Sequence, residues 1–116
     1  MVSYRWKIFW ANLDPVVGSE QSGRRPVLVV SAEEVNQNLP IVTVLPLTSV
    51  GPARRVYPTE VCLSGEVTGL PRDSLVMAHQ IRTISKRRLE EECGSVEGVD
   101  KREEIRAAIE RHLGFI

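Results

Sequence analysis

The sequence predicts a mainly β protein of the α+β class, built as a small antiparallel barrel with short flanking helices and a C-terminal helix. Several short segments rich in β-branched and aromatic residues are separated by clusters of Gly, Pro, Ser and Asp. The last part of the chain changes to an amphipathic helical pattern. Its 116 residues suit one domain, since domains commonly hold about 100–150 residues. We therefore expect a single domain over residues 1–116.

The strands follow from the apolar patterns between turn residues. The predicted strands cover residues 5–13, 26–30, 41–47, 57–63, 74–78 and about 80–83. Trp6, Ile8 and Trp10 share one face of the first strand by period-two alternation. The run Pro-Val-Leu-Val-Val over 26–30 is continuously apolar, which is typical of a central strand covered on both faces.

Capping patterns predict the helices. Ser31 and Glu34 form a capping box before a helical turn over 32–37, and Ser85 is a candidate N-cap of a brief helix that ends by Gly94. In that helix Ile84 is placed to contact Leu89 as a hydrophobic staple. The C-terminal helix has Asp100 as its predicted N-cap, Glu103 in its capping box, an apolar stripe of Ile105, Ala108, Ile109, His112 and Leu113, and Gly114 as its C-cap.

Charge alone does not indicate nucleic-acid binding. Fifteen basic and fifteen acidic residues cancel, so any RNA must be bound by a local basic patch. The acidic residues concentrate late in the chain, at Glu90, Glu91, Glu92, Glu97, Asp100, Glu103, Glu104 and Glu110. This distribution leaves residues 18–25 without excess negative charge.

The two cysteines predict a reducing environment. Cys62 and Cys93 lie far apart and form no Cys-x-x-Cys unit, so we expect buried, apolar thiols and not a disulfide or a zinc site. The apolar runs fall short of the ~20 residues of a membrane helix, and the N-terminus lacks the pattern of a signal peptide. We expect a cytoplasmic protein with no membrane partner.

The segment over residues 18–25 is the strongest candidate for chemistry. It places Glu20, hydroxyls, an amide and two guanidinium groups between glycines, immediately before an apolar strand. Alternation directs Arg24 and Arg25 to opposite faces, and Pro26 holds Arg25 in an extended backbone. A planar guanidinium fork suits two phosphate oxygens. The alternative is a solvated arginine pair at a strand edge.

Hydroxyl and carboxylate candidates surround this segment. Thr48 and Ser49 end the strand over 41–47, where hydroxyls often satisfy turn backbone. If that strand pairs with residues 26–30, Thr48 approaches Arg25. Two interpretations of Glu20 are open: it acts as a base, or it tethers the loop by accepting a hydrogen bond from Arg24 or Arg25.

Two further groups have the chemistry to contact RNA. Arg54 and Arg55 follow Gly51-Pro52 in a predicted loop, which suits capture of single-stranded RNA as well as ordinary solubility. Gln80 and Arg82 share one face of an alternating segment, from which an amide and a guanidinium can reach bases or phosphate. An exposed structural strand would have the same pattern.

Histidine and metal chemistry are the competing possibilities. His79 and His112 could act as base and acid in RNA cleavage. The position of His112 on an apolar helical stripe favours a packed histidine instead. No cluster of His, Asp and Glu has the spacing of metal ligands, so we expect no metal and no other cofactor.

The order of these motifs resembles the MazF/PemK (Kid) toxins, the mRNA interferases of type II toxin–antitoxin systems. The similarity covers nearly the whole chain. Its motifs are Gly-Ser-Glu-Gln-x-Gly-x-Arg-Pro over 18–26 with Val-Leu-Val-Val-Ser after it, Leu-Pro-Leu-Thr-Ser over 45–49, Arg-Asp-Ser over 72–74, Gln-Ile-Arg-Thr-Ile over 80–84, and Arg-Leu at 88–89.

The resemblance implies an SH3-like barrel that forms a homodimer and cuts single-stranded RNA without metal, leaving a 2′,3′-cyclic phosphate and a 5′-hydroxyl. It also implies a cognate antitoxin whose acidic or amphipathic C-terminal segment occludes the RNA groove. The family's arginine falls on Arg25, its threonine on Thr48, and a loop carboxylate on Glu20. We expect RNA contacts from Ser19, Gln21, Arg24, Ser49, Arg54, Arg55, Gln80 and Arg82.

In this reading Arg25 stabilises the phosphorane, Thr48 donates to a nonbridging oxygen, and Glu20 takes the 2′-OH proton. Two other functions remain open. The tail Gly114-Phe115-Ile116 is faintly similar to that of CcdB-type gyrase poisons, although two apolar residues packed on the barrel would explain it. A non-catalytic SH3-like binding module is the third, and the presence of both Arg25 and Thr48 counts against it.

Overall fold

The computed structural model describes residues 2–51 and 56–115. Its strands are β1 Lys7–Asn12, β2 Arg24–Val29, β3 Ile41–Ser49, β4 Glu60–Leu63, β5 Ser74–Met77, β6 Arg82–Ser85 and β7 Leu89–Ser95. Its helices are α1 Glu33–Asn38, α2 Gly65–Thr68 and α3 Val99–Leu113, together with the 3-10 turns η1 Ala78–Gln80 and η2 Lys86–Arg88. The α+β class with mainly β content is confirmed.

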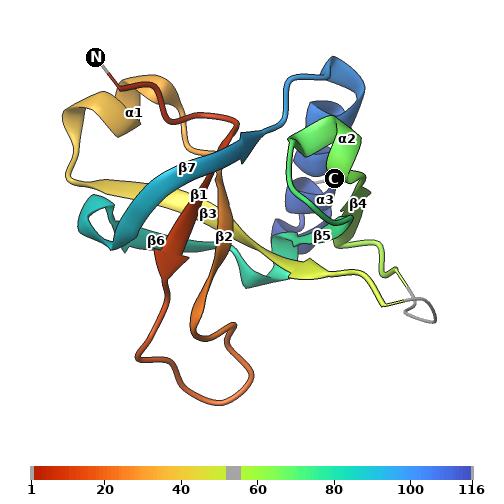
Figure 1. Cartoon of the computed structure of the whole chain (residues 1–116), viewed down its shortest axis with the longest axis horizontal. Helices are drawn as coiled ribbons and strands as arrows, with labels where there is room; N and C mark the ends of the chain where they lie inside the picture. Colours follow the sequence, from red (N-terminus) through yellow and green to blue (C-terminus); the bar gives the residue numbers. More distant parts are fainter. Residues whose placement is uncertain (1, 52–55, 116) are drawn as a thin grey trace.

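The strands form one strongly bent antiparallel sheet in the order β4-β5-β3-β2-β1-β7. The long strand β3 connects its two parts, because its first half pairs with β6 and its last residues pair with β5 (Figure 1). In the described part of the chain the end strands β4 and β7 do not pair with each other, so the barrel is open.

Hydrophobic clusters cover both faces of the sheet. On β2, Val27 and Val29 belong to one cluster and Leu28 to the other, and all three are fully buried. The predicted central strand covered on both sides is therefore confirmed. Helix α3 packs against β4 and η1 through Ile105 and Ala108. Burying such side chains supplies most of the stability that holds the site in place.

The helix predicted after Ser85 is wrong. Ser85 does cap a turn, because its Oγ accepts a hydrogen bond from the Arg87 N–H, but only the 3-10 turn η2 follows. The chain then extends into β7, which pairs with β1 around Phe9 and Glu92. Without β7, that edge of β1 would be unpaired, and this long-range pairing overrides the local helix propensity. Ile84 and Leu89 share a cluster as expected.

Other boundaries also differ from the prediction. Residues 78–80 form η1, so the strand predicted from about 80 begins at Arg82, and β4 begins only at Glu60. The predicted turn at 64–65 opens the short helix α2, because Ser64 Oγ accepts from the Val67 N–H. The first strand begins at Lys7, because Trp6 has a positive φ of 66°.

Most caps of the longer helices also differ from those predicted from the sequence. Ser31 is not an N-cap: it donates to Asn36 Oδ1 and accepts from the Thr43 N–H at 3.0 Å. Helix α3 starts at Val99, one residue before the predicted cap Asp100. Its buried stripe ends at Ile109, since His112 and Leu113 are exposed. The C-cap is confirmed, with Gly114 in the left-handed region at a φ of 75°.

Three expectations about single side chains can be compared with the structure. Cys62 is exposed, so its predicted burial is wrong, whereas Cys93 packs partly against the core. Phe115 is 74% exposed, so the expectation that it packs on the barrel is wrong. Among the described residues, no helix is both long and apolar enough to span a bilayer.

Glu33 fixes the N-terminal segment to α1. Its carboxylate accepts hydrogen bonds from the backbone N–H groups of Tyr4 and Arg5 and from the side chains of Asn36 and Gln37. Burial opposes ionisation of this carboxyl, but the four donors outweigh it and lower its pKa to about 2. Glu33 therefore stays charged at all but very acidic pH.

Candidate active site

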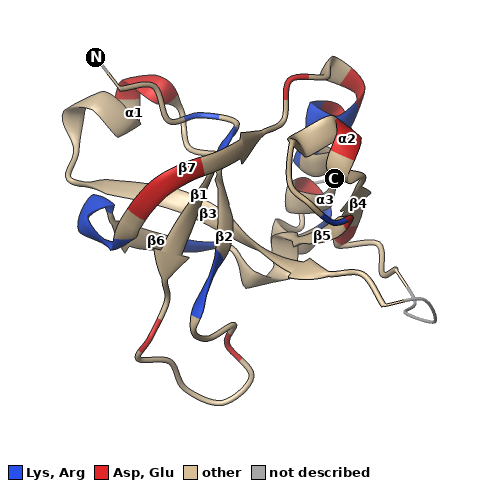
Figure 2. Cartoon of the chain, in the orientation of Figure 1, with Lys and Arg blue, Asp and Glu red and all other residues tan. Residues whose placement is uncertain are grey.

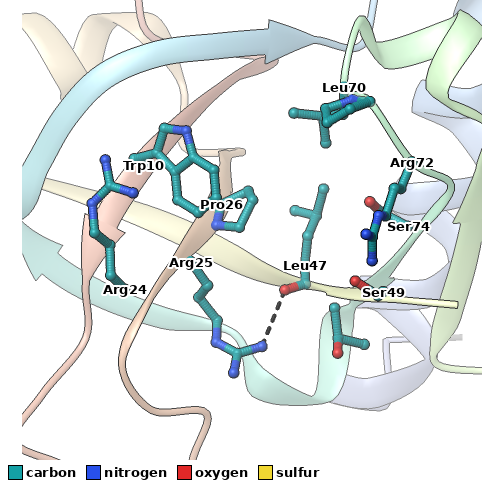
Figure 3. A pocket seen from close by; sticks show the side chains of 11 residues that line it. Trp10, Arg24, Arg25, Pro26, Leu47, Ser49, Leu70, Arg72 and Ser74 are labelled. Atoms are coloured by element: carbon teal, nitrogen blue, oxygen red, sulfur yellow. Dashed lines mark hydrogen bonds between the residues drawn. The ribbon is translucent and has the colours of Figure 1, made fainter.

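The pairing of β2 with β3 brings Arg25 and Thr48 to one pocket. Val27 lies opposite Pro46 and Leu28 opposite Leu45, so the ends of the two strands run together toward Arg25 and Thr48. The pocket has a volume of about 440 Å³. Its lining, drawn in Figure 3, consists of Trp10, Arg24, Arg25, Pro26, Leu47, Thr48, Ser49, Leu70, Pro71, Arg72 and Ser74. The expected approach of Thr48 to Arg25 is confirmed.

The Arg25 guanidinium is held by backbone carbonyls. Its Nε donates to the Ser22 carbonyl at 2.9 Å. Its Nη1 donates to the Leu47 carbonyl at 3.3 Å, the bond drawn in Figure 3. An arginine has five N–H donors, and the other three bond to no residue that the structure describes. Arg25 is therefore oriented by the fold and still able to bind an anion.

Arg24 points away from Arg25, as alternation predicts, but both side chains line the same pocket, so the expectation that only one of them can face it is wrong. Its guanidinium lies 4.4 Å from the centre of the Trp10 ring and forms ion pairs with Glu90 at 2.6 Å and Glu91 at 2.7 Å. The hydrogen bond that Arg24 donates to Glu90 raises the pKa of Arg24 above its usual value. The positive charge of Arg24 is thus largely compensated within the protein.

These ion pairs correct the expectation that residues 18–25 are free of excess negative charge. Glu90 and Glu91 lie late in the sequence, but β7 pairs with β1 and returns them to the start of β2 (Figure 2). Distance along the chain is no guide to distance in space across a paired sheet.

Glu20 is bound within its own loop. Its Oε1 accepts a hydrogen bond from the Val17 N–H, and Glu20 is exposed and absent from the pocket lining. The tethering partner is thus Val17 and not Arg24 or Arg25. The loop extends from the end of the sheet between β1 and β2 (Figure 1).

Gln80, Arg82 and Arg88 hold this loop to the fold. Gln80 Nε2 donates to the Ser19 carbonyl at 3.1 Å, and its Oε1 accepts from the Gln21 N–H at 3.2 Å. Arg82 Nη1 donates to the Leu13 carbonyl at 3.3 Å, and Arg88 Nη1 donates to the carbonyls of Asn12 and Asp14 at 3.0 and 2.7 Å. We call these three side chains the loop clamp.

Apart from Ser49, the other wall of the pocket was not predicted as part of the site. Ser49 lies opposite Ser74 where β3 pairs with β5, and Leu70, Pro71 and Arg72 precede that strand. Trp10 enters from β1, opposite Pro26. The Arg-Asp-Ser motif over 72–74 was the sequence feature that could have indicated Arg72 and Ser74 as site residues.

Comparison with known proteins identifies the family. A family model described as "PemK-like, MazF-like toxin of type II toxin-antitoxin system" matches residues 4–113. The chain belongs to this family. It is similar to Endoribonuclease EndoA of Bacillus subtilis, with 40% identity over 89 residues that cover 77% of this chain and 76% of the relative.

Two solved MazF-like structures share the fold. MazF from Deinococcus radiodurans has a TM-score of 0.82 and 30% identity, with 98% of each chain covered. A mycobacterial endoribonuclease in complex with its cognate antitoxin has a TM-score of 0.79 and 25% identity, covering 99% of this chain and 98% of that chain. The family resemblance and the fold inferred from it are therefore confirmed.

The histidines of this MazF-like toxin lie outside the pocket. His79 Nδ1 is 3.0 Å from Thr59 Oγ1, and His112 is exposed near the end of α3, so its predicted packing is wrong. Within residues 2–51 and 56–115, no group of three or more His, Cys, Asp or Glu side chains is placed to hold a metal. Arg54 and Arg55 lie outside the described residues.

Proposed function

We propose that this protein is an endoribonuclease toxin that cuts single-stranded RNA in the pocket between β2 and β3. The observation that carries the proposal is the meeting of Arg25 and Thr48 in one pocket of a MazF-like fold. The similarity to EndoA supports it, since that relative is an endoribonuclease. We further propose that residues 1–116 form a single toxin domain that acts as a homodimer in the cytoplasm.

The proposed reaction is a transesterification. The 2′-oxygen attacks the adjacent phosphorus and loses its proton, the bond from phosphorus to the 5′-oxygen breaks, and that oxygen takes up a proton. The products are a 2′,3′-cyclic phosphate and a 5′-hydroxyl. Arg25 stabilises the negative charge of the phosphorane with its free N–H donors, and Thr48 donates to a nonbridging oxygen. This route requires no metal ion.

Glu20 is the proposed base, and its geometry sets a condition on that role. The carboxylate must leave the Val17 N–H and turn toward the pocket before it can accept the 2′-OH proton. Removal of the substrate proton would then depend on movement within the loop.

The proposed RNA contacts fall into three groups. Ser49 lines the pocket directly, and Ser19 and Gln21 lie on the loop beside it. Arg24, Gln80 and Arg82 already bind other groups of the protein and contact RNA with their remaining surface. Arg54 and Arg55 complete the set as predicted from sequence.

The proposed protein partner is a cognate antitoxin. The mycobacterial neighbour was solved in complex with its cognate antitoxin. The pocket of this chain is lined by Arg24, Arg25 and Arg72, and no carboxylate is among its lining residues. An acidic or amphipathic antitoxin segment would be attracted to that charge and would block RNA.

The test is cleavage of a long single-stranded RNA, followed by sequencing of the ends. We expect the wild type to cut RNA at a short sequence with or without EDTA, and to leave DNA and a gyrase–DNA mixture intact. Arg25→Ala lowers kcat by about 100- to 1000-fold, as expected for loss of a group that stabilises the transition state. Thr48→Val gives a smaller loss, and both variants keep the wild-type circular dichroism.

Full activity in a folded Arg25→Ala protein would remove Arg25 from the mechanism. Activity that disappears with EDTA would require a metal-dependent route. If the protein cut no RNA and DNA were cleaved only when gyrase was present, the gyrase-poison function would be favoured.

A further inference from the structure

We propose that Arg72, together with Ser49 and Ser74, forms a second phosphate-binding subsite in the pocket. It would bind the RNA phosphate that neighbours the scissile one. The inference rests on the proposed RNA cleavage. It assigns a second RNA phosphate, next to the scissile one, to Arg72, Ser49 and Ser74.

The first argument is the position of Arg72. It lines the same pocket as Arg25 and Thr48. Figure 3 shows Arg72 and Arg25 on opposite sides of the pocket, with the Arg72 guanidinium directed toward Ser49 and Ser74. A pocket of about 440 Å³ falls within the usual range of ligand sites, ~300–1000 Å³. Arg25 and Arg72 can thus contact two phosphates of one bound strand.

The second argument is charge. Arg72 is exposed and makes no hydrogen bond or ion pair with a residue that the structure describes. Arg24 differs, because Glu90 and Glu91 compensate it. An arginine stays protonated at any relevant pH and its planar fork matches two phosphate oxygens. Arg72 therefore places an uncompensated cation beside the predicted path of a polyanion.

The third argument is that the segment carrying Arg72 is rigid. The Asp73 carboxylate accepts from the Gly65 N–H at 3.0 Å, and Thr68 Oγ1 accepts from the Leu70 N–H at 3.1 Å. The turn is so tight that a Cβ on Gly65 would lie 2.6 Å from the Leu70 carbonyl oxygen. The backbone that carries Arg72 is therefore already ordered, and a bound ligand has to order only the Arg72 side chain.

The fourth argument is the pair of hydroxyls beside Arg72. Ser49 and Ser74 are cross-strand neighbours of β3 and β5, and both line the pocket. Serine hydroxyls are frequent donors to nucleic-acid phosphates. Thr48 and Ser49 both line the pocket, so the hydroxyls beside Arg72 share one site with the donors proposed for the scissile phosphate.

The experiment begins with the cleavage site mapped for the wild type. An oligonucleotide of that sequence, made non-cleavable by a 2′-deoxy substitution at the cut, is bound to wild type, Arg72→Ala and Arg72→Gln. Arg111→Ala is the matched control, since Arg111 is an exposed arginine on α3 that is not among the residues lining the pocket. Methylphosphonate is then placed at one phosphate at a time to remove its charge.

We expect Arg72→Ala to weaken binding by roughly tenfold or more, as for loss of a charged hydrogen bond. The slope of log K against log salt should fall by about 0.7, the value of one phosphate contact to a single strand. The loss should disappear on the oligonucleotide whose phosphate next to the scissile one is uncharged. Arg111→Ala should bind like the wild type.

Unchanged binding by folded Arg72→Ala and Arg72→Gln would overturn the subsite. A loss that is the same wherever the methylphosphonate is placed would also overturn it, because Arg72 would then contribute only general attraction. In either case wild-type RNA cleavage would still stand. A wild type that cuts no RNA would instead refute the proposed function itself.

Discussion

The side-chain amide of Gln80 donates to the carbonyl of Ser19 at 3.1 Å and so joins two segments that are 61 residues apart. The same amide accepts the Gln21 N–H at 3.2 Å. Both polar ends of Gln80 are thus used to hold the loop that precedes Arg25. This arrangement gives Gln80 a positioning role beside the RNA contact proposed for it.

Gln80→Ala should release the loop without unfolding the sheet. We expect faster amide exchange of Gln21 and a kcat/KM lowered by about tenfold, since each lost hydrogen bond costs ~0.5–1.5 kcal/mol. Gln80→Glu keeps the acceptor for Gln21 and should give an intermediate effect. Weaker RNA binding with unchanged exchange at Gln21 would show instead that Gln80 acts only by contacting RNA.

Removal of Arg24 should expose two carboxylates near the pocket. We expect Arg24→Ala to raise KM by roughly fivefold, because the carboxylates of Glu90 and Glu91 would then repel the RNA phosphates. The expected effect is modest because both ion pairs are exposed and therefore weak. Combining it with Glu90→Gln and Glu91→Gln should restore part of the wild-type KM in steady-state cleavage assays, and the remaining defect measures the RNA contact proposed for Arg24. A combined variant with the full wild-type KM would show that Arg24 makes no such contact.

Glu33 should contribute stability that depends on pH. Its folded pKa of about 2 lies below its ordinary value of 4.5, so its contribution is complete above pH 4.5 and is lost as pH falls toward 2. Urea unfolding of wild type and Glu33→Gln should therefore show a stability difference that is constant above pH 4.5 and shrinks below it. A difference that stays constant down to pH 2 would contradict the role of the carboxylate.

Local patterns were sufficient to predict the centre of the fold and of the site. The apolar run after Pro26 identified a strand buried on both faces, and the strand that ends at Thr48 was correctly expected to approach Arg25. Both inferences needed only alternation, burial and one strand pairing. These are properties of short segments, and tertiary contacts reinforce them.

The remaining features depend on contacts between distant segments. Residues 89–95 have a good local pattern for a helix, and only the open edge of β1 makes them a strand. The same pairing brings Glu90 to Arg24, and the distribution of charges along the sequence does not predict this ion pair. The loop clamp and the pocket wall that carries Arg72 are likewise formed by segments that meet only in the folded sheet. Sequence alternation selected Gln80 and Arg82 as site residues, but it did not indicate which groups they contact.

The loop clamp binds its loop only through main-chain atoms, namely four carbonyl oxygens and one N–H. Side chains of the clamped segment can therefore diverge during evolution without loss of its attachment. Substitutions of exposed side chains in this loop can change what it presents to a bound strand while its attachment to the sheet stays the same.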